Sequence, residues 1–268
     1  MKILGQTIPD GMLNADEADY LAHHARDGMP VEEVWQLMDQ AWDELGAGFG
    51  PGDSDALAAF YKSPVWLLNG FFVEYDPKSL AHREAIAQWA VVGSPATVVD
   101  FGGGFGALAR RIAMRLPAST VTVVEEYPNP LALHFARRHA NLKYSRALPE
   151  SCDLMIAQDV LEHVLSPLKV FQQLAHGTRV GGHIVTANCF EPLIKCHYRG
   201  TFHLRFTFRH IAPSLGCKYV GTIVNAPHAQ IFKRTDKQID ERKAARLEKI
   251  SRTLYPILNF LSVVKRRL

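Results

Sequence analysis

The segment from Val98 to Ala109, with the sequence VVDFGGGFGALA, constrains the fold more than any other part of the chain. An apolar run ends in an aspartate, four glycines follow within five residues, and a helix-forming stretch begins. Glycine lets the chain turn tightly, and it lets a ligand approach the backbone where a Cβ atom would collide. The segment therefore predicts a buried strand, a ligand-binding bend and a helix, as in open α/β sheets, whose ligands bind beyond the carboxyl ends of the strands.

Short apolar runs alternate with helical stretches from residue 97 to residue 234. Alternation of this kind predicts a parallel sheet with helices on both faces. We therefore expect a doubly wound α/β domain over residues 91–234. The predicted strands are 97–101, 121–125, 142–148, 152–157, 183–190, 218–224 and 228–234, and the predicted helices are 107–115, 131–138, 167–176 and 207–216.

Two further regions flank this domain. Residues 1–90 predict a helical N-terminal cap, whose first helix begins with a capping box formed by Asn14 and Glu17. Residues 235–268 predict a basic amphipathic C-terminal helix. Two roles remain open for this helix: peripheral contact with anionic lipid, or contact with protein, either the cap or a second copy of the chain.

The formal net charge of +3 is unevenly distributed. From Lys233 to Leu268 there are 11 Lys/Arg and 4 Asp/Glu, a balance of +7, whereas the rest of the chain has 19 Lys/Arg and 23 Asp/Glu. An acidic main body does not favour nucleic acid, so we expect no nucleic-acid partner. The N-terminus turns acidic before any apolar run, and the four cysteines form no CxxC pair. These features predict a cytoplasmic protein with reduced thiols and no disulfide framework.

Asp100 narrows the choice of ligand for the bend. The glycines also satisfy the dinucleotide pattern GxGxxG/A, at Gly102, Gly104 and Ala107. A carboxylate two residues before the first glycine would repel a pyrophosphate, and it suits a ligand with a cationic amine or hydroxyl donors. Glu125, at the end of the second predicted strand, lies where an acid accepts hydrogen bonds from ribose hydroxyls. These residues predict a ligand that contains adenosine.

The combination of Asp100, the glycines, Glu125 and the later segment SCDLMIAQDVLEHV resembles class I methyltransferases that depend on S-adenosylmethionine (SAM). The resemblance implies a seven-stranded Rossmann-like sheet, mostly parallel with an antiparallel last strand, and SAM as the cofactor. The family often has an aspartate near the end of the third strand, and LKYSRAL has none. The cofactor-binding residues that the resemblance implies are Asp100, Phe101, Gly102, Gly103, Gly104, Gly106, Glu125, Glu126, Tyr127, Gln158 and Asp159.

The stretch after the fifth predicted strand contains the densest set of polar side chains in the chain. In the class I fold this stretch borders the acceptor pocket, so His197 or His203 is a candidate base for an acceptor hydroxyl or amine. His163, beside Glu162, is a further candidate base. The alternative for both His163 and Glu162 is a structural role. The same stretch faintly resembles methyltransferases of surface-polysaccharide or secondary-metabolite pathways.

Two other features of this stretch bear on ligands. Lys195 and Arg205 could hold a carboxylate or phosphate of the acceptor. Cys189, Cys196 and His197 are of the residue types that bind zinc, but their spacing is irregular, so no metal is predicted.

The resemblance predicts an enzyme that transfers a methyl group from SAM to an O, N or C atom of a small-molecule or sugar acceptor, with histidine-assisted deprotonation. Three alternatives remain: a SAM enzyme with non-methyl chemistry that releases methylthioadenosine, a nicotinamide dehydrogenase, and a non-catalytic SAM-binding protein. Aromatic residues before the first strand either close over the sulfonium or pack in the cap. These residues are Tyr61, Trp66, Phe71, Phe72 and Tyr75.

Overall fold

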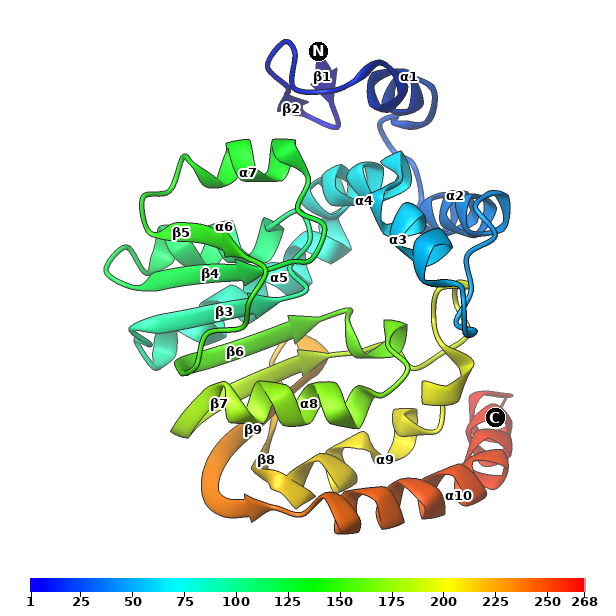
Figure 1. The fold of residues 1–268 in the computed structure, drawn as a ribbon, viewed down its shortest axis with the longest axis vertical. Coiled ribbons are helices and arrows are strands. Elements are labelled where there is room, and N and C mark those ends of the chain that lie inside the picture. Colours follow the sequence, from blue (N-terminus) through cyan, green and yellow to red (C-terminus); the bar gives the residue numbers. More distant parts are fainter. Residues whose placement is uncertain (268) are drawn as a thin grey trace.

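The computed structural model describes residues 1–267 as a layered α/β body with a helical region on one side and a long C-terminal helix along its edge (Figure 1). The strands are β1 (Lys2–Ile3), β2 (Gln6–Thr7), β3 (Thr97–Phe101), β4 (Thr120–Val124), β5 (Leu142–Ser145), β6 (Cys152–Gln158), β7 (Thr178–Ala187), β8 (Leu215–Ile223) and β9 (Ala226–Ile239). The α-helices are α1 (Ala15–His24), α2 (Val31–Glu44), α3 (Ser54–Lys62), α4 (Pro64–Tyr75), α5 (Pro77–Val92), α6 (Ala107–Arg115), α7 (Pro130–Ala136), α8 (Pro167–His176), α9 (Leu204–Ile211) and α10 (Glu241–Arg267). Short 3-10 helices are η1 (Leu161–His163), η2 (Arg199–Thr201) and η3 (Ala212–Ser214).

The main sheet has seven strands in the order β5-β4-β3-β6-β7-β9-β8. The strands from β5 to β7 pair in parallel, and β9 pairs antiparallel with both of its neighbours. The prediction of a mostly parallel seven-stranded sheet with an antiparallel last strand is confirmed. The order reverses between β3 and β6, which places the topological switch point at the ends of these two strands. In Figure 1 the carboxyl ends of the parallel strands point toward α2, α3 and α4.

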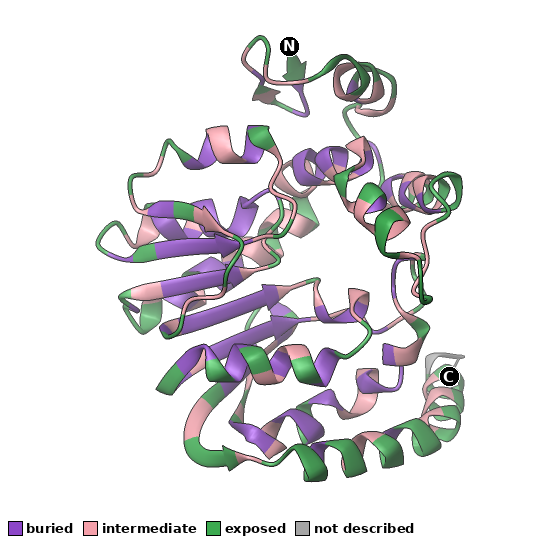
Figure 2. Ribbon diagram, viewed as in Figure 1, coloured by how far each residue is buried: buried purple, intermediate pink, exposed green. Residues whose placement is uncertain are grey.

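Hydrophobic cores cover both faces of the sheet, as the continuous apolar runs predict. On one face, side chains of α5 and α6 such as Ile86 and Ile112 pack against Val98 and Val123. On the other face, Phe171 of α8 and Phe208 of α9 pack against Phe232, with ring centroids 5.1 and 5.8 Å from the Phe232 ring. Figure 2 shows the buried strands between helices whose outer sides are exposed.

The N-terminal region is helical, with a small β1–β2 ribbon that the sequence analysis did not predict. Asn14 accepts a hydrogen bond from the Glu17 backbone N–H at 2.8 Å, and the Glu17 carboxylate accepts one from the Asn14 N–H at 3.0 Å, so the predicted capping box is confirmed. Helix α5 crosses the predicted boundary at residues 90 and 91, and Ala85, Ile86 and Ala90 belong to the core under the sheet. Strand β9 likewise continues five residues into the predicted tail, to Ile239.

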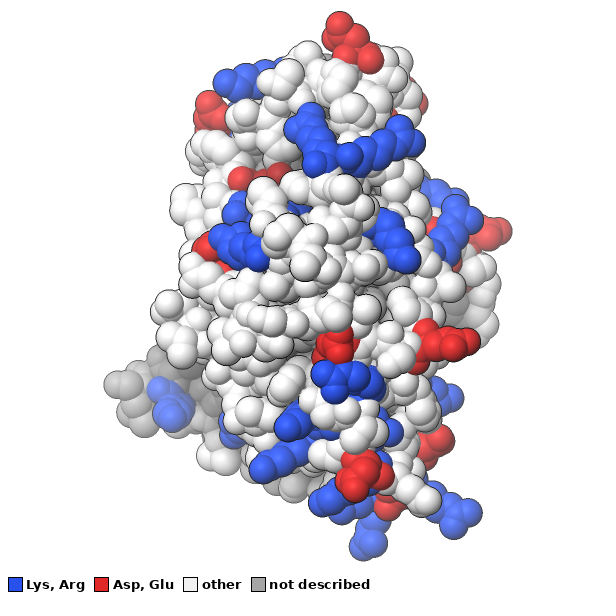
Figure 3. Space-filling model, turned by 90° about the vertical axis from the view of Figure 1, so that its left-hand side faces the viewer, with Lys and Arg blue, Asp and Glu red and all other residues white. Residues whose placement is uncertain are grey.

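Helix α10 differs between its two halves. Ala244 is buried and Leu247 packs beside it in the core that contains α9, whereas Ile257 and Phe260, beyond Pro256, are 60% and 67% exposed. The predicted tail includes Leu268, which lies outside the described residues. None of the helices within residues 1–267 combines the length and apolar character needed to cross a membrane. Figure 3 shows Lys and Arg side chains gathered at the end of the molecule where Figure 1 places β9 and the start of α10.

Candidate active site

The glycine bend follows β3 directly and turns the chain into α6. Gly102, Gly104 and Gly106 have φ angles of +66°, +51° and +76°, a region that glycine enters without steric cost. A Cβ atom on Gly103 would lie 2.6 Å from the Asp100 carboxylate, whereas one on Gly104 would meet nothing within 4 Å. The bend is therefore tightly packed underneath and open at Gly104, as a ligand cradle requires.

Asp100 lies underneath the bend and is 2% exposed. Burial raises the pKa of its carboxyl group to about 7, against the opposing attraction of Arg83 and with a smaller contribution from Glu125 in the same direction. Phe101 is half-buried and packs against the core beside α8 and α9. The structure thus places Asp100 where it holds the shape of the bend rather than on the open side.

Arg83, on α5, is a site residue that the sequence analysis missed. Its guanidinium lies 4.0 Å from the Asp159 carboxylate and also attracts that of Asp100. Burial lowers the pKa of Arg83, and the two carboxylates oppose that shift. Arg83 therefore connects the carboxyl ends of β3 and β6 electrostatically. No local motif marks this arginine, because its importance comes from the docking of α5 on the sheet.

Glu125 follows β4 and faces the bend. Its carboxylate accepts hydrogen bonds from the backbone N–H of Gly104 at 2.9 Å and of Tyr127 at 3.2 Å. A carboxylate has about four lone-pair positions, so hydroxyl donors can still bind. Glu126 is exposed, and its hydrogen bond raises the pKa of the Tyr127 phenol. Glu125 and the bend are therefore in direct contact.

Strand β6 ends in the polar pair Gln158–Asp159. Asp159 has a φ of +54°, an uncommon conformation for a residue with a side chain, and its backbone N–H donates to the Ala187 carbonyl of β7 at 2.7 Å. The Gln158 amide donates to the Asp159 carboxylate at 3.2 Å. This turn directs the chain from the switch point into η1.

Glu162 and His163 of η1 meet His197, which comes from the loop after β7. The two imidazole rings have centroids 4.9 Å apart. Burial lowers the pKa of His163 to about 3, with His197 as the second cause, and burial also lowers the pKa of His197. Burial, followed by the repulsion of Asp159, raises the pKa of Glu162 to about 8. The structure brings together two of the three candidate bases.

Residues 99–186, from the end of β3 to β7, match the family model described as "Methyltransferase domain". That segment is a methyltransferase domain. The prediction of a class I methyltransferase fold is confirmed. The match to a methyltransferase domain agrees with the prediction of SAM as its cofactor. No protein of curated function is similar enough in sequence to count as a relative.

Solved structures resemble about three quarters of the chain in fold. An O-methyltransferase family protein from Burkholderia thailandensis superposes with a TM-score of 0.52 at 12% identity, over 77% of this chain and 71% of that one. Human N-acetylserotonin methyltransferase, solved in complex with SAM, has a TM-score of 0.48 at 16% identity, over 76% of this chain and 67% of that one. At these identities the likeness concerns the fold alone.

The third candidate base lies apart from His163 and His197. His203 is 4% exposed, its Nδ1 is 2.9 Å from the Ser251 hydroxyl of α10, and its Nε2 is 3.6 Å from the Glu248 carboxylate. His203 therefore connects α9 to the C-terminal helix, and we assign it no part in catalysis.

The two candidate anion-binding residues have acidic partners. Lys195 pairs with Asp43 of α2, and its backbone N–H donates to the Asp39 carboxylate at 2.6 Å. Arg205 lies 3.0 Å from the Glu191 carboxylate. Lys195 therefore connects the loop after β7 to α2 of the cap.

The aromatic residues of the cap divide into two groups. Phe71 and Phe72 are fully buried in the cap core. Trp66 instead lies 6.1 Å from the His163 ring, and its buried indole N–H has no hydrogen-bond partner within the described residues. The Tyr61 ring packs beside the Trp66 ring. Burial raises the pKa of the Tyr61 phenol, and the electrostatic effects of Cys196, Glu162 and Glu125 raise it further. The cap thus contributes Tyr61 and Trp66 to the site.

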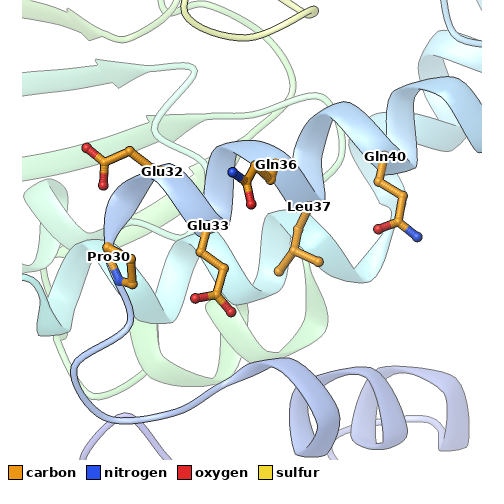
Figure 4. Close-up of a pocket in the computed structure, with 6 residues that line it drawn as sticks. All are labelled: Pro30, Glu32, Glu33, Gln36, Leu37 and Gln40. Atoms are coloured by element: carbon orange, nitrogen blue, oxygen red, sulfur yellow. The ribbon is translucent and has the colours of Figure 1, made fainter.

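A separate surface groove lies on α2 and has a volume of about 420 Å³. Figure 4 shows its lining side chains along α2. None of the predicted site residues lines this groove. The lining residues are Pro30, Glu32, Glu33, Gln36, Leu37 and Gln40.

Proposed function

We propose that the protein transfers a methyl group from SAM to an O, N or C atom of a small-molecule or sugar acceptor. The observation that carries this proposal is the open glycine bend in contact with Glu125, at the switch point of the matched methyltransferase domain. The acidic balance of the chain before Lys233 and the small-molecule acceptors of the neighbours support the acceptor class.

The residues around the bend fit the cofactor. Gly104 leaves space for a ligand against the backbone, and Glu125 keeps lone pairs for ribose hydroxyls. Asp100 and Arg83 hold the bend and the β6 turn in place from below. When bound, SAM supplies a methyl group on a sulfonium. The thioether that remains after methyl transfer is a good leaving group. The protein's own task is then to orient the acceptor and exclude water.

The acceptor side is the cluster of Glu162, His163 and His197 under Trp66. Both imidazoles are neutral near pH 7, because burial lowers both pKa values. A neutral imidazole can assist deprotonation in two ways. Its lone pair can accept the acceptor's proton, or it can bind a cation that makes an acceptor hydroxyl more acidic.

Calorimetry with SAM and S-adenosylhomocysteine tests the cofactor site. We expect the wild-type chain to bind both compounds, and Gly104→Val to weaken binding at least tenfold, because valine is strained at this φ and fills the open space. Gly93→Ala is the matched control, because no atom lies within 4 Å of its new Cβ. Absence of affinity in the wild type would contradict the proposal.

Product analysis distinguishes the alternatives. With an acceptor, methyl transfer releases S-adenosylhomocysteine, whereas aminobutyryl transfer or cyclisation releases methylthioadenosine. Enhanced NADH fluorescence on mixing would instead favour a dehydrogenase. Binding of SAM without turnover of any acceptor would favour the non-catalytic alternative.

A further inference from the structure

We propose that Glu162, His163 and His197 form a binding site for one divalent first-row transition metal ion of the Zn²⁺, Mn²⁺ or Fe²⁺ type. One potential ligand atom from each of these three residues lies within 4.8 Å of the other two. Two residues are consecutive in η1, and the third comes from the loop after β7, so the fold brings the set together. This set differs from the cysteine-containing zinc set considered from the sequence.

The hydrogen bonds of the two histidines leave the required lone pairs free. His163 Nδ1 is 3.0 Å from the Cys196 carbonyl, and His197 Nδ1 is 2.7 Å from the Glu191 carbonyl. A carbonyl oxygen can only accept, so each Nδ1 carries the proton and donates it. In a neutral imidazole the lone pair is then on Nε2. Metal-binding histidines commonly have this arrangement, because the outer hydrogen bond fixes the tautomer and the ring orientation.

Glu162 provides a carboxyl oxygen as the third potential ligand atom. The residue is fully buried, and its Oε1 accepts a hydrogen bond from the Cys189 backbone N–H at 2.7 Å. Its Oε2 is buried without a hydrogen-bond partner within the described residues. An unpartnered buried carboxylate oxygen costs free energy, and a cation would remove that cost. The nearby Asp159 carboxylate adds further negative charge.

The ligand types decide which cation fits. Two imidazole nitrogens and one carboxylate oxygen suit zinc or a redox-active first-row ion, whereas Mg²⁺ and Ca²⁺ prefer oxygen ligands throughout. Three protein ligands also leave coordination positions open, as in catalytic rather than structural sites.

The role of the ion rests on the proposed function. Glu162 and His163 directly follow the β6 turn, and the cluster lies beside Tyr61 and Trp66 of the cap. An acceptor hydroxyl bound at an open position would lose its proton more readily, and that proton would pass to water. Of the two ways in which a histidine can assist deprotonation, the structure favours the one in which the imidazoles bind the cation.

Metal binding is tested on the full chain after treatment with a chelator. We expect Zn²⁺ to bind with one equivalent in calorimetry, and Co²⁺ to give a visible d–d absorption band that Zn²⁺ abolishes. Glu162→Gln and His197→Gln should each weaken Zn²⁺ binding more than tenfold, and His176→Gln, at an exposed histidine on α8, should leave it unchanged. Cys189→Ala keeps the backbone N–H that Glu162 accepts from, and it should also bind normally.

The outcomes separate this inference from the proposed function. No saturable binding of either ion, binding unaffected by both cluster variants, or loss of binding in Cys189→Ala would overturn the metal site. SAM affinity is measured in parallel on the metal-free chain and on both variants, where we expect it to be retained. SAM binding without metal binding would refute only the metal site, and metal binding without SAM binding would refute only the proposed function. Circular dichroism confirms that each variant is folded.

Discussion

Asp100 is a residue whose ionisation the fold opposes. Burial raises its pKa from 3.8 to about 7. The folded protein therefore keeps a proton that the unfolded chain releases above about pH 4. The stability that Asp100 contributes is fully present below that pH and is lost as the pH rises toward 7. One pKa unit corresponds to about 1.4 kcal/mol, so the loss amounts to at most about 4 kcal/mol.

Asp100→Asn removes this titration and keeps the shape of the side chain. We expect the free energy of unfolding to fall less between pH 4.5 and pH 7.5 in the variant than in the wild type. Urea unfolding at several pH values measures the difference, in which the contributions of groups that do not interact with Asp100 cancel. Parallel pH curves for the two proteins would show that Asp100 does not carry a raised pKa.

Arg83 lies near the carboxylates of Asp100 and Asp159, at the carboxyl ends of β3 and β6. Arg83→Gln leaves the Asp100 and Asp159 carboxylates without their shared cation, so we expect the free energy of unfolding to fall by about 1–3 kcal/mol. Arg26→Gln is the matched control, because Arg26 pairs with Glu33 at the surface, and such a pair contributes under about 1 kcal/mol. Equal losses in the two variants would contradict the role of Arg83.

At the scale of elements, the contact between α4 and the glycine bend is tightly packed. A Cβ atom on Gly70 would lie 2.6 Å from Phe105 Cγ. We expect Gly70→Ala to destabilise the protein by about 1–3 kcal/mol through overpacking, although alanine favours helix. Chemical denaturation measures this, with Gly93→Ala as the control within about 0.5 kcal/mol. A stabilised Gly70→Ala variant would show that α4 can move away from the bend.

The two halves of α10 should respond differently to the same substitution. Ala244→Asp places a charge at a buried position, where we expect a loss of several kcal/mol. Phe260→Asp changes an exposed residue, so we expect a change within about 0.5 kcal/mol. Thermal unfolding of both variants measures the contrast. Similar melting temperatures would mean that the first half of α10 is not docked.

At the scale of the whole molecule, the sequence predicts the α/β layers well. Helices α6 and α8 have the predicted bounds, because each follows a punctuating residue, Gly106 or Ser166–Pro167. The strands were predicted because burial on both faces makes them continuous apolar runs. The predicted bend and Glu125 also meet, since both follow adjacent parallel strands.

Contacts between distant elements could not be predicted in the same way. The pairing of His163 with His197, the approach of Tyr61 and the position of Arg83 all depend on how the cap, α5 and the loop after β7 pack. Periodicity describes which face of an element is apolar, and it does not specify which polar groups will meet. His203 illustrates the limit, because it follows the same loop but packs against α10.

Phe105 lies within the glycine bend and packs on Phe71 of α4 and Phe135 of α7, at centroid distances of 5.1 and 5.6 Å. The bend, which we propose binds the nucleoside of SAM, therefore shares the hydrophobic contacts of Phe105 with the N-terminal helices. As a consequence, we expect a substitution on the inner side of the cap to alter the cofactor affinity without contacting the cofactor. The cofactor affinity should then depend in part on a segment that lies outside the matched methyltransferase domain.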